Sequence, residues 1–216
     1  MPSQLALPLE PLSAMARGDF IAAPGNASAL AFIDAWPHWP APAAALHGPE
    51  ASGKSHLAHV WAAASGAAIL AARDLREPPD GPLVIEDVDA AAGQAHEPAL
   101  FALMERGTPL LLTGRAAPAA WPAALPDLAS RFRALLAFGL GAPDEALLLA
   151  LAVKLFADRQ LAVPESVLTH LVRRLERSPA ALRDFIARAD AAALAAQKPV
   201  TLPLIRALMA DSAPPS

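Results

Sequence analysis

The stretch Gly48-Pro49-Glu50-Ala51-Ser52-Gly53-Lys54-Ser55 decides the fold of this chain. It has the spacing G-x-x-x-x-G-K-[ST], in which a loop turns successive backbone N–H groups inward around a phosphate. An apolar run precedes the loop and a helical pattern follows it, so the positive end of that helix faces the bound anion. A chance glycine-containing loop is the alternative. We expect the whole stretch to bind the phosphates of ADP or ATP, with Lys54 neutralising charge and Ser55 joining a Mg²⁺ shell.

Short apolar strands alternate with helices on both sides of this loop. Strands are predicted over Ala43–His47, Ala67–Ala72, Leu83–Glu86, Pro109–Thr113 and Ala134–Phe138, and helices over Asn26–Trp36, Ser55–Ala64 and Ala99–Arg106. Such alternation indicates an α/β fold with a parallel five-stranded sheet that is covered on both faces. We expect a nucleotide-binding domain over residues 16–141.

The pattern becomes purely helical after Gly141. Helices are predicted over Asp144–Gln160, Pro164–Arg177, residues 179–197 and a short segment from Thr201, with Asp144 and Ser178 placed as N-caps. We therefore expect residues 142–216 to be a small all-helical lid domain. Residues 1–15 have no helical or strand period and contain two prolines, so they are expected to be a flexible tail.

Composition excludes several classes of protein. The net charge of −4 gives no basic excess, so direct sequence-specific DNA binding is not expected. The chain has no cysteine, which excludes disulfides and thiolate metal sites and suits the cytosol. Its longest apolar stretch, near Leu147–Val153, is far shorter than the ~20 residues that span a bilayer, and no signal peptide is evident. We expect a cytoplasmic protein with no membrane contact.

Two carboxylates follow the strand Leu83–Ile85. Glu86 stands at the strand's end, where a carboxylate beside the phosphate loop can hold water or Mg²⁺, and Asp87 can orient an attacking water. The alternative is an acidic turn that leaves a strand. We assign Glu86 to the metal and Asp87 to catalysis.

Further segments carry a resemblance to a known family. The chain resembles the DnaA-related AAA+ proteins, and most closely the Hda-type regulators that inactivate the DnaA initiator, over nearly its whole length. The segments are Asp19-Phe20-Ile21 with Asn26, Leu112-Thr113-Gly114-Arg115, Leu125-Pro126-Asp127-Leu128-Ala129-Ser130-Arg131-Phe132, Ala181-Leu182-Arg183-Asp184 and Gln4-Leu5-Ala6-Leu7-Pro8-Leu9.

The resemblance assigns roles to these segments. It implies an AAA+ P-loop domain with a helical lid, in which Phe20 and Ile21 cover the adenine. Arg131 is implied to be an arginine finger supplied in trans, and Arg183 a lid arginine that contacts a phosphate. Taken alone, either arginine would more commonly be a solvated surface residue.

The tail resembles the short clamp-binding motif of Hda-type proteins. Gln4, Leu5, Leu7, Pro8 and Leu9 would form an extended peptide with apolar anchors and one amide, suited to a hydrophobic pocket. The partner implied is the beta subunit of the DNA polymerase III sliding clamp. An apolar disordered tail is the alternative.

The resemblance implies a negative regulator of replication initiation. Bound to ADP and to the clamp, it would stimulate ATP hydrolysis by DnaA. No basic recognition helix follows Met209, as expected for a regulator without the DNA-binding domain of the initiators. Self-association is compatible with the sequence, which does not determine the oligomeric state.

Some residues differ from those in the motifs of efficient ATPases. Ala51 replaces a common loop glycine, Glu86 replaces Asp, and the segment around Thr113 lacks an asparagine. We therefore expect weak or no intrinsic hydrolysis. Two other functions remain open: a nucleotide-gated adaptor without a catalytic part, and an autonomous P-loop ATPase.

Overall fold

The chain folds into a sheet domain followed by a helical lid. The computed structural model describes residues 15–77, 79–90 and 96–210. Its strands are β1 (Ala43–His47), β2 (Ala68–Ala71), β3 (Leu83–Glu86), β4 (Leu110–Gly114) and β5 (Leu136–Gly139). Its α-helices are α1 (Ala27–Asp34), α2 (Lys54–Ser65), α3 (Glu97–Arg106), α4 (Pro126–Ala134), α5 (Glu145–Asp158), α6 (Glu165–Arg174), α7 (Pro179–Ala196) and α8 (Leu202–Ala210). Short 3₁₀ turns are η1 (Arg17–Asp19), η2 (Ala72–Asp74) and η3 (Pro118–Ala120).

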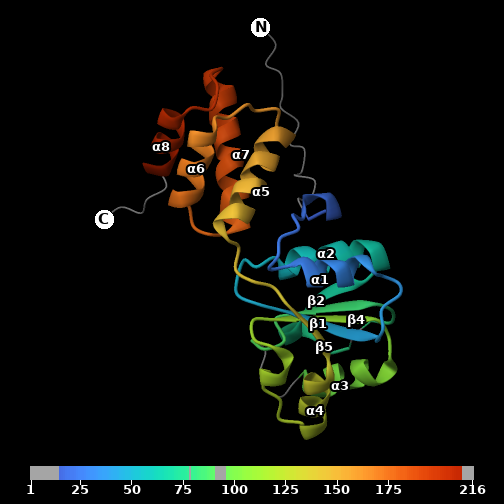
Figure 1. Cartoon of the computed structure of the whole chain (residues 1–216). Helices are drawn as coiled ribbons and strands as arrows, with labels where there is room; N and C mark the ends of the chain where they lie inside the picture. Colours follow the sequence, from blue (N-terminus) through green and yellow to red (C-terminus); the bar gives the residue numbers. More distant parts are fainter. Residues whose placement is uncertain (1–14, 78, 91–95, 211–216) are drawn as a thin grey trace.

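The described strands form one parallel sheet in the order β2-β3-β4-β1-β5. Helices α1 and α2 lie on one face of it, and α3 and α4 lie on the other (Figure 1). Successive side chains of β1 pack on opposite faces of the sheet. Ala44 and Leu46 belong to the apolar cluster under α1 and α2, whereas Ala45 belongs to the cluster under α3 and α4. This alternation buries β1 on both sides, as a parallel α/β sheet requires.

The register of the sheet brings three strand ends together. His47 at the end of β1 is level with Gly114 of β4, and Leu46 is level with Thr113. Strand β3, which ends at Glu86, is the other neighbour of β4. In open α/β sheets, ligands bind outside the carboxyl ends of the strands. The phosphate loop, which begins directly after His47, lies at this edge.

Helices α5 to α8 form the lid around an apolar core of their own, and they lie above the sheet domain in Figure 1. Both predicted N-caps are confirmed. Asp144 Oδ1 accepts a hydrogen bond from Leu147 N at 2.7 Å, and Ser178 Oγ accepts one from Ala181 N at 3.3 Å. Pro179 fills the first turn of α7, where the missing N–H has no helical partner.

One helix was not predicted, and several element boundaries differ from those predicted. The segment that was predicted as a strand from Ala134 begins with the last residue of α4, and the chain becomes a strand only from Leu136. Helix α4 itself was missed, although Pro126 in its first turn and the buried pair Leu128 and Phe132 are ordinary helix signals. Helix α6 ends at Arg174, three residues early, because Leu175 is extended.

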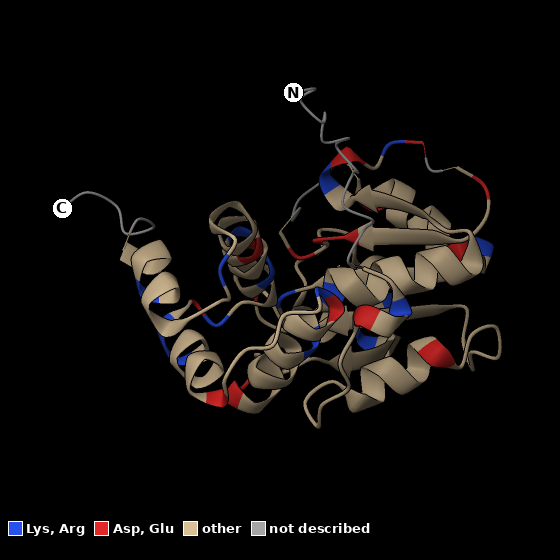
Figure 2. Ribbon diagram, turned by 90° about the horizontal axis from the view of Figure 1, so that it is seen from above, with Lys and Arg blue, Asp and Glu red and all other residues tan. Residues whose placement is uncertain are grey.

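Basic and acidic residues are interspersed along the ribbon of both domains (Figure 2). Several pairs on the surface are within ion-pair distance, such as Arg17 with Asp34 and Arg173 with Glu145. Exposed pairs of this kind contribute at most about 1 kcal/mol each. Among the described helices, none is long and apolar enough to cross a membrane.

Candidate functional site

A cavity of about 210 Å³ lies between the sheet domain and the lid. Its walls come from the N-terminal segment, the phosphate loop with the start of α2, and lid helices α5 and α7. The lining residues are Met15, Asp19, Phe20, Ile21, Asn26, Ala51, Ser52, Gly53, Lys54, Ser55, His56, Leu147, Leu151, Pro179, Ala180 and Arg183. The cavity therefore brings together the second half of the predicted phosphate loop, the predicted adenine-covering residues and the predicted lid arginine.

The loop backbone adopts conformations that only small residues tolerate well. A Cβ on Gly48, which has φ +152°, would lie 2.2 Å from the carbonyl oxygen of Leu140. Gly53 caps α2 with φ +101° and is overlaid by the ring of Phe20. Ala51 has φ +60°, the left-handed region that favours glycine, so its replacement of glycine in the motif places strain at this point.

Lys54 is folded against its own loop. Its Nζ donates to Gly48 O and Pro49 O, both at 2.8 Å, and lies 3.4 Å from Ser52 Oγ. Burial lowers the pKa of Lys54, while the negative charge of Asp87 opposes that shift. Nearly all of the side chain is shielded from solvent, so an anion in the cavity would find this charge only weakly screened.

The acidic end of β3 lies beside the loop but outside the cavity lining. Glu86 Oε1 is buried and, among the described residues, has no hydrogen-bond partner. Asp87 is exposed and has φ +56°, and its backbone N–H donates to Thr113 Oγ1 at 3.3 Å. The loop residues Gly48, Pro49 and Glu50 do not line the cavity either. Glu50 is exposed and pairs with Arg115 at 3.4 Å.

A buried asparagine shapes the adenine-covering segment. Asn26 precedes α1, and its Oδ1 accepts from Ala23 N at 2.8 Å while its Nδ2 donates to Ile21 O at 3.1 Å. These bonds fix the turn that presents Phe20 and Ile21 to the cavity. The ring of Phe20 also meets the ring of His56 edge-on, with centroids 5.2 Å apart.

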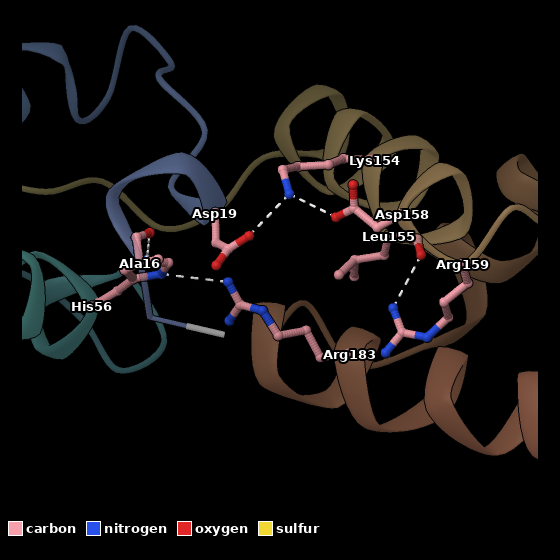
Figure 3. A network of polar contacts seen from close by, with 8 residues as sticks. All are labelled: Ala16, Asp19, His56, Lys154, Leu155, Asp158, Arg159 and Arg183. Carbon is pink, nitrogen blue, oxygen red and sulfur yellow. Dashed lines mark hydrogen bonds and ion pairs between the residues drawn. The ribbon is translucent and has the colours of Figure 1, made fainter. Parts of the chain in front are cut away.

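Polar contacts join the N-terminal segment to the lid (Figure 3). Arg183 Nη2 lies 3.4 Å from His56 Nδ1, and Lys154 Nζ donates to Asp19 Oδ1 at 3.0 Å. Burial lowers the pKa of Arg183 and that of His56. The role of His56, Asp19 and Lys154 was not predicted, because each contact joins residues that are distant in the sequence.

Arg131 lies elsewhere. It is on α4, which covers the face of the sheet opposite to α2 (Figure 1), and it does not line the cavity. Its guanidinium pairs with Glu105 of α3 and lies 5.0 Å from the centre of the Phe101 ring. Two backbone N–H groups before α4, those of Ala124 and Leu125, donate to the buried carboxylate of Glu97.

The predicted clamp-binding residues Gln4 to Leu9 lie outside the described residues.

The connector from β5 to the lid crosses the start of the phosphate loop. Leu140 N donates to His47 O at 2.7 Å, immediately before Gly48, and Leu140 O is the atom that excludes a side chain at Gly48. Gly141 N then donates to Gly25 O at 2.9 Å, in the segment that precedes α1. The connector is therefore bonded to two walls of the site.

Comparison with known proteins shows which family model and which solved structures this chain resembles. Residues 144–209 match the family described as Hda, lid domain. No curated protein sequence matches the chain. The structure of domain III of the replication initiation protein DnaA from Thermotoga maritima is similar with a TM-score of 0.76 and 21% identity, covering 97% of this chain and 100% of that one.

Two further solved structures share the fold. AMPPCP-bound DnaA from Aquifex aeolicus has a TM-score of 0.67 and 15% identity, with 81% of this chain and 64% of that chain covered. The RuvB Holliday junction branch migration motor from Thermotoga maritima has a TM-score of 0.66 and 15% identity, with 85% and 66% covered. Residues 144–209 thus match an Hda lid domain, and the chain as a whole shares its fold with domain III of DnaA.

Proposed function

We propose that the cavity binds an adenine nucleotide, in the resting state ADP. Its composition fits such a ligand at both ends. Phe20, Ile21, Leu147 and Leu151 provide apolar surface for a base, whereas Lys54 and the neighbouring loop N–H groups provide positive charge for phosphates. Arg183 lines the same cavity, and its buried Nε has no hydrogen-bond partner among the described residues. An oxygen of the nucleotide would satisfy it.

The acidic end of β3 fits a hard divalent cation. Glu86 Oε1 is a buried carboxylate oxygen without a hydrogen-bond partner among the described residues, and Ser55 is exposed at the start of α2. Oxygen ligands of this type suit Mg²⁺, which retains several waters of its own. Mg²⁺ would neutralise phosphate charge, with Ser55 and Glu86 as its ligands. Asp87 is proposed to orient the water in any residual hydrolysis by this chain.

We further propose that the chain is a negative regulator of replication initiation that acts on the DnaA initiator. The observation that carries this proposal is the match of residues 144–209 to an Hda lid, together with the cavity that this lid shares with the phosphate loop. The chain, with ADP bound, would associate with a loaded sliding clamp through Gln4, Leu5, Leu7, Pro8 and Leu9. It would then place Arg131 beside the ATP of DnaA. An arginine at a transferring γ-phosphate stabilises the charge that develops there.

The test reconstitutes the reaction. ATP-bound DnaA is mixed with the sliding clamp on DNA, and hydrolysis is followed with and without the chain and ADP. We expect faster hydrolysis only when all components are present, and none when Gln4→Ala/Leu7→Ala removes the clamp contact. Equal hydrolysis with and without the chain would overturn the regulatory proposal. Appreciable turnover by the chain alone would instead indicate an autonomous ATPase.

A second function has one observation in its favour. Because Arg131 already pairs with Glu105 and lies over Phe101, its guanidinium is occupied within its own domain. A nucleotide-gated adaptor would bridge the clamp and DnaA and leave Arg131 in this pair. Clamp-dependent binding of DnaA without faster hydrolysis would favour this adaptor over the catalytic partner.

A further inference from the structure

His56 lies on one wall of the cavity and contacts the other two. It is the third residue of α2, two positions after Lys54, and its side chain is buried. Its ring touches Phe20 of the N-terminal segment edge-on, its Nε2 lies 3.0 Å from Ala16 O, and its Nδ1 lies 3.4 Å from Arg183 Nη2 of the lid. Figure 3 shows the ring between the N-terminal segment and the arginine.

The two neighbours of the ring assign its tautomer. The carbonyl oxygen of Ala16 only accepts hydrogen bonds, so Nε2 must carry the hydrogen. The Arg183 guanidinium only donates, so Nδ1 must be the acceptor. The neutral ring with hydrogen on Nε2 satisfies both neighbours. The histidine therefore joins a backbone acceptor, Ala16 O, to a cationic donor, Arg183 Nη2.

This contact governs where the Arg183 guanidinium points. Among the described residues, His56 is the hydrogen-bond partner of Arg183, and Arg183 Nε remains buried without one. One edge of the guanidinium is thus fixed by the ring, and the remaining N–H groups are left for a ligand in the cavity. A second contact, from Lys154 to Asp19, joins lid helix α5 to the same N-terminal segment.

We propose that His56 is a positioning residue that directs Arg183 toward a nucleotide phosphate and joins lid helix α7 to the N-terminal segment. This inference rests on the proposed binding of nucleotide in the cavity. It makes a prediction of its own: the affinity for ADP depends more on the Nδ1 acceptor, which faces Arg183, than on the Nε2 donor, which faces Ala16. A ring that merely filled space would show no such distinction.

Two substitutions separate the two bonds. The Oδ1 of His56→Asn occupies approximately the place of Nδ1 and keeps an acceptor for Arg183, but the side chain is too short for Ala16 O. The amide nitrogen of His56→Gln reaches the place of Nε2 and restores a donor to Ala16 O, without the acceptor. ADP binding with Mg²⁺ is measured by calorimetry on the full chain, and thermal unfolding of each variant without ADP is the folding control.

We expect His56→Ala to bind ADP about tenfold more weakly, the change that follows from loss of one hydrogen bond to a charged group. His56→Asn should recover most of this loss and His56→Gln little of it. The loss should also vanish in the Arg183→Ala background, because both changes remove one interaction. His59→Asn, one turn later on α2, is the matched control and should bind like the unchanged chain.

Equal affinities of the Asn and Gln variants, or additive losses in the double variant, would overturn the positioning role while leaving nucleotide binding intact. If the unchanged chain takes up no ADP, the proposed function fails, and the role of His56 fails with it.

Discussion

The two arginines singled out by the sequence lie in opposite surroundings. Arg183 is half-buried in the cavity, has one histidine partner and retains an unpartnered Nε among the described residues. Arg131 is 39% exposed on α4, and its guanidinium is occupied by Glu105 and Phe101. Under the proposed function, Arg183 binds a ligand of its own chain. Arg131 would exchange its partner Glu105 for the ATP of another molecule.

The largest effect is expected at Arg131. Arg131→Ala should reduce clamp-dependent stimulation of DnaA hydrolysis by about 10³-fold, the lower range for removal of an arginine finger. ADP binding should be unchanged, because Arg131 does not line the cavity. Hydrolysis by DnaA and calorimetry with ADP measure the two effects separately. Arg133→Ala, an exposed arginine on the same helix, is the control; an equal loss there would remove the distinction between the two residues.

The next largest effect is expected on the affinity of the cavity for ADP. Lys54→Ala removes a buried cation and should weaken ADP binding about 100-fold, equivalent to about 2.7 kcal/mol. Calorimetry on the intact chain measures this change, with the exposed Lys198→Ala as control. Stimulation of DnaA should fall only at ADP concentrations that leave the variant empty. Normal ADP affinity in Lys54→Ala would contradict the assignment of the cavity to phosphate.

The smallest effect tests whether Glu105 restrains Arg131. Glu105→Gln removes the charge of the partner, and exposed ion pairs are worth at most about 1 kcal/mol. We expect stimulated hydrolysis to rise by about two- to fivefold, since 1.4 kcal/mol is a factor of ten. Initial rates of DnaA hydrolysis measure it, with the exposed Glu165→Gln of the lid as control. Slower hydrolysis would show instead that Glu105 supports the active position of Arg131.

Local signals predicted much of this molecule. The phosphate-loop motif located the turn after β1, and the caps Asp144 and Ser178 located two lid helices, because each feature depends on residues within one or two turns of the chain. The departure at Ala51 was visible in the sequence as well, and the structure places that residue at positive φ. Periodicity over Ala134–Phe138 gave the wrong element at its start, because short apolar segments suit either a helix end or a strand.

The contacts that complete the site could not be predicted in this way. Arg183 and His56 are 127 positions apart, and Lys154 and Asp19 are 135 apart. No local pattern specifies such pairs, which depend on how the lid is seated on the sheet domain. The spacing of His56 to His59 is a local relation within one helix, and it carries no information about Arg183.

The crossing of Leu140 over Gly48 has a mechanical consequence. The same short run of main chain is bonded to the last residue of β1 and, through Gly141, to the segment that precedes α1, and it then continues into the lid. The lid is therefore covalently continuous with main chain that is hydrogen-bonded both to the start of the phosphate loop and to the segment before α1.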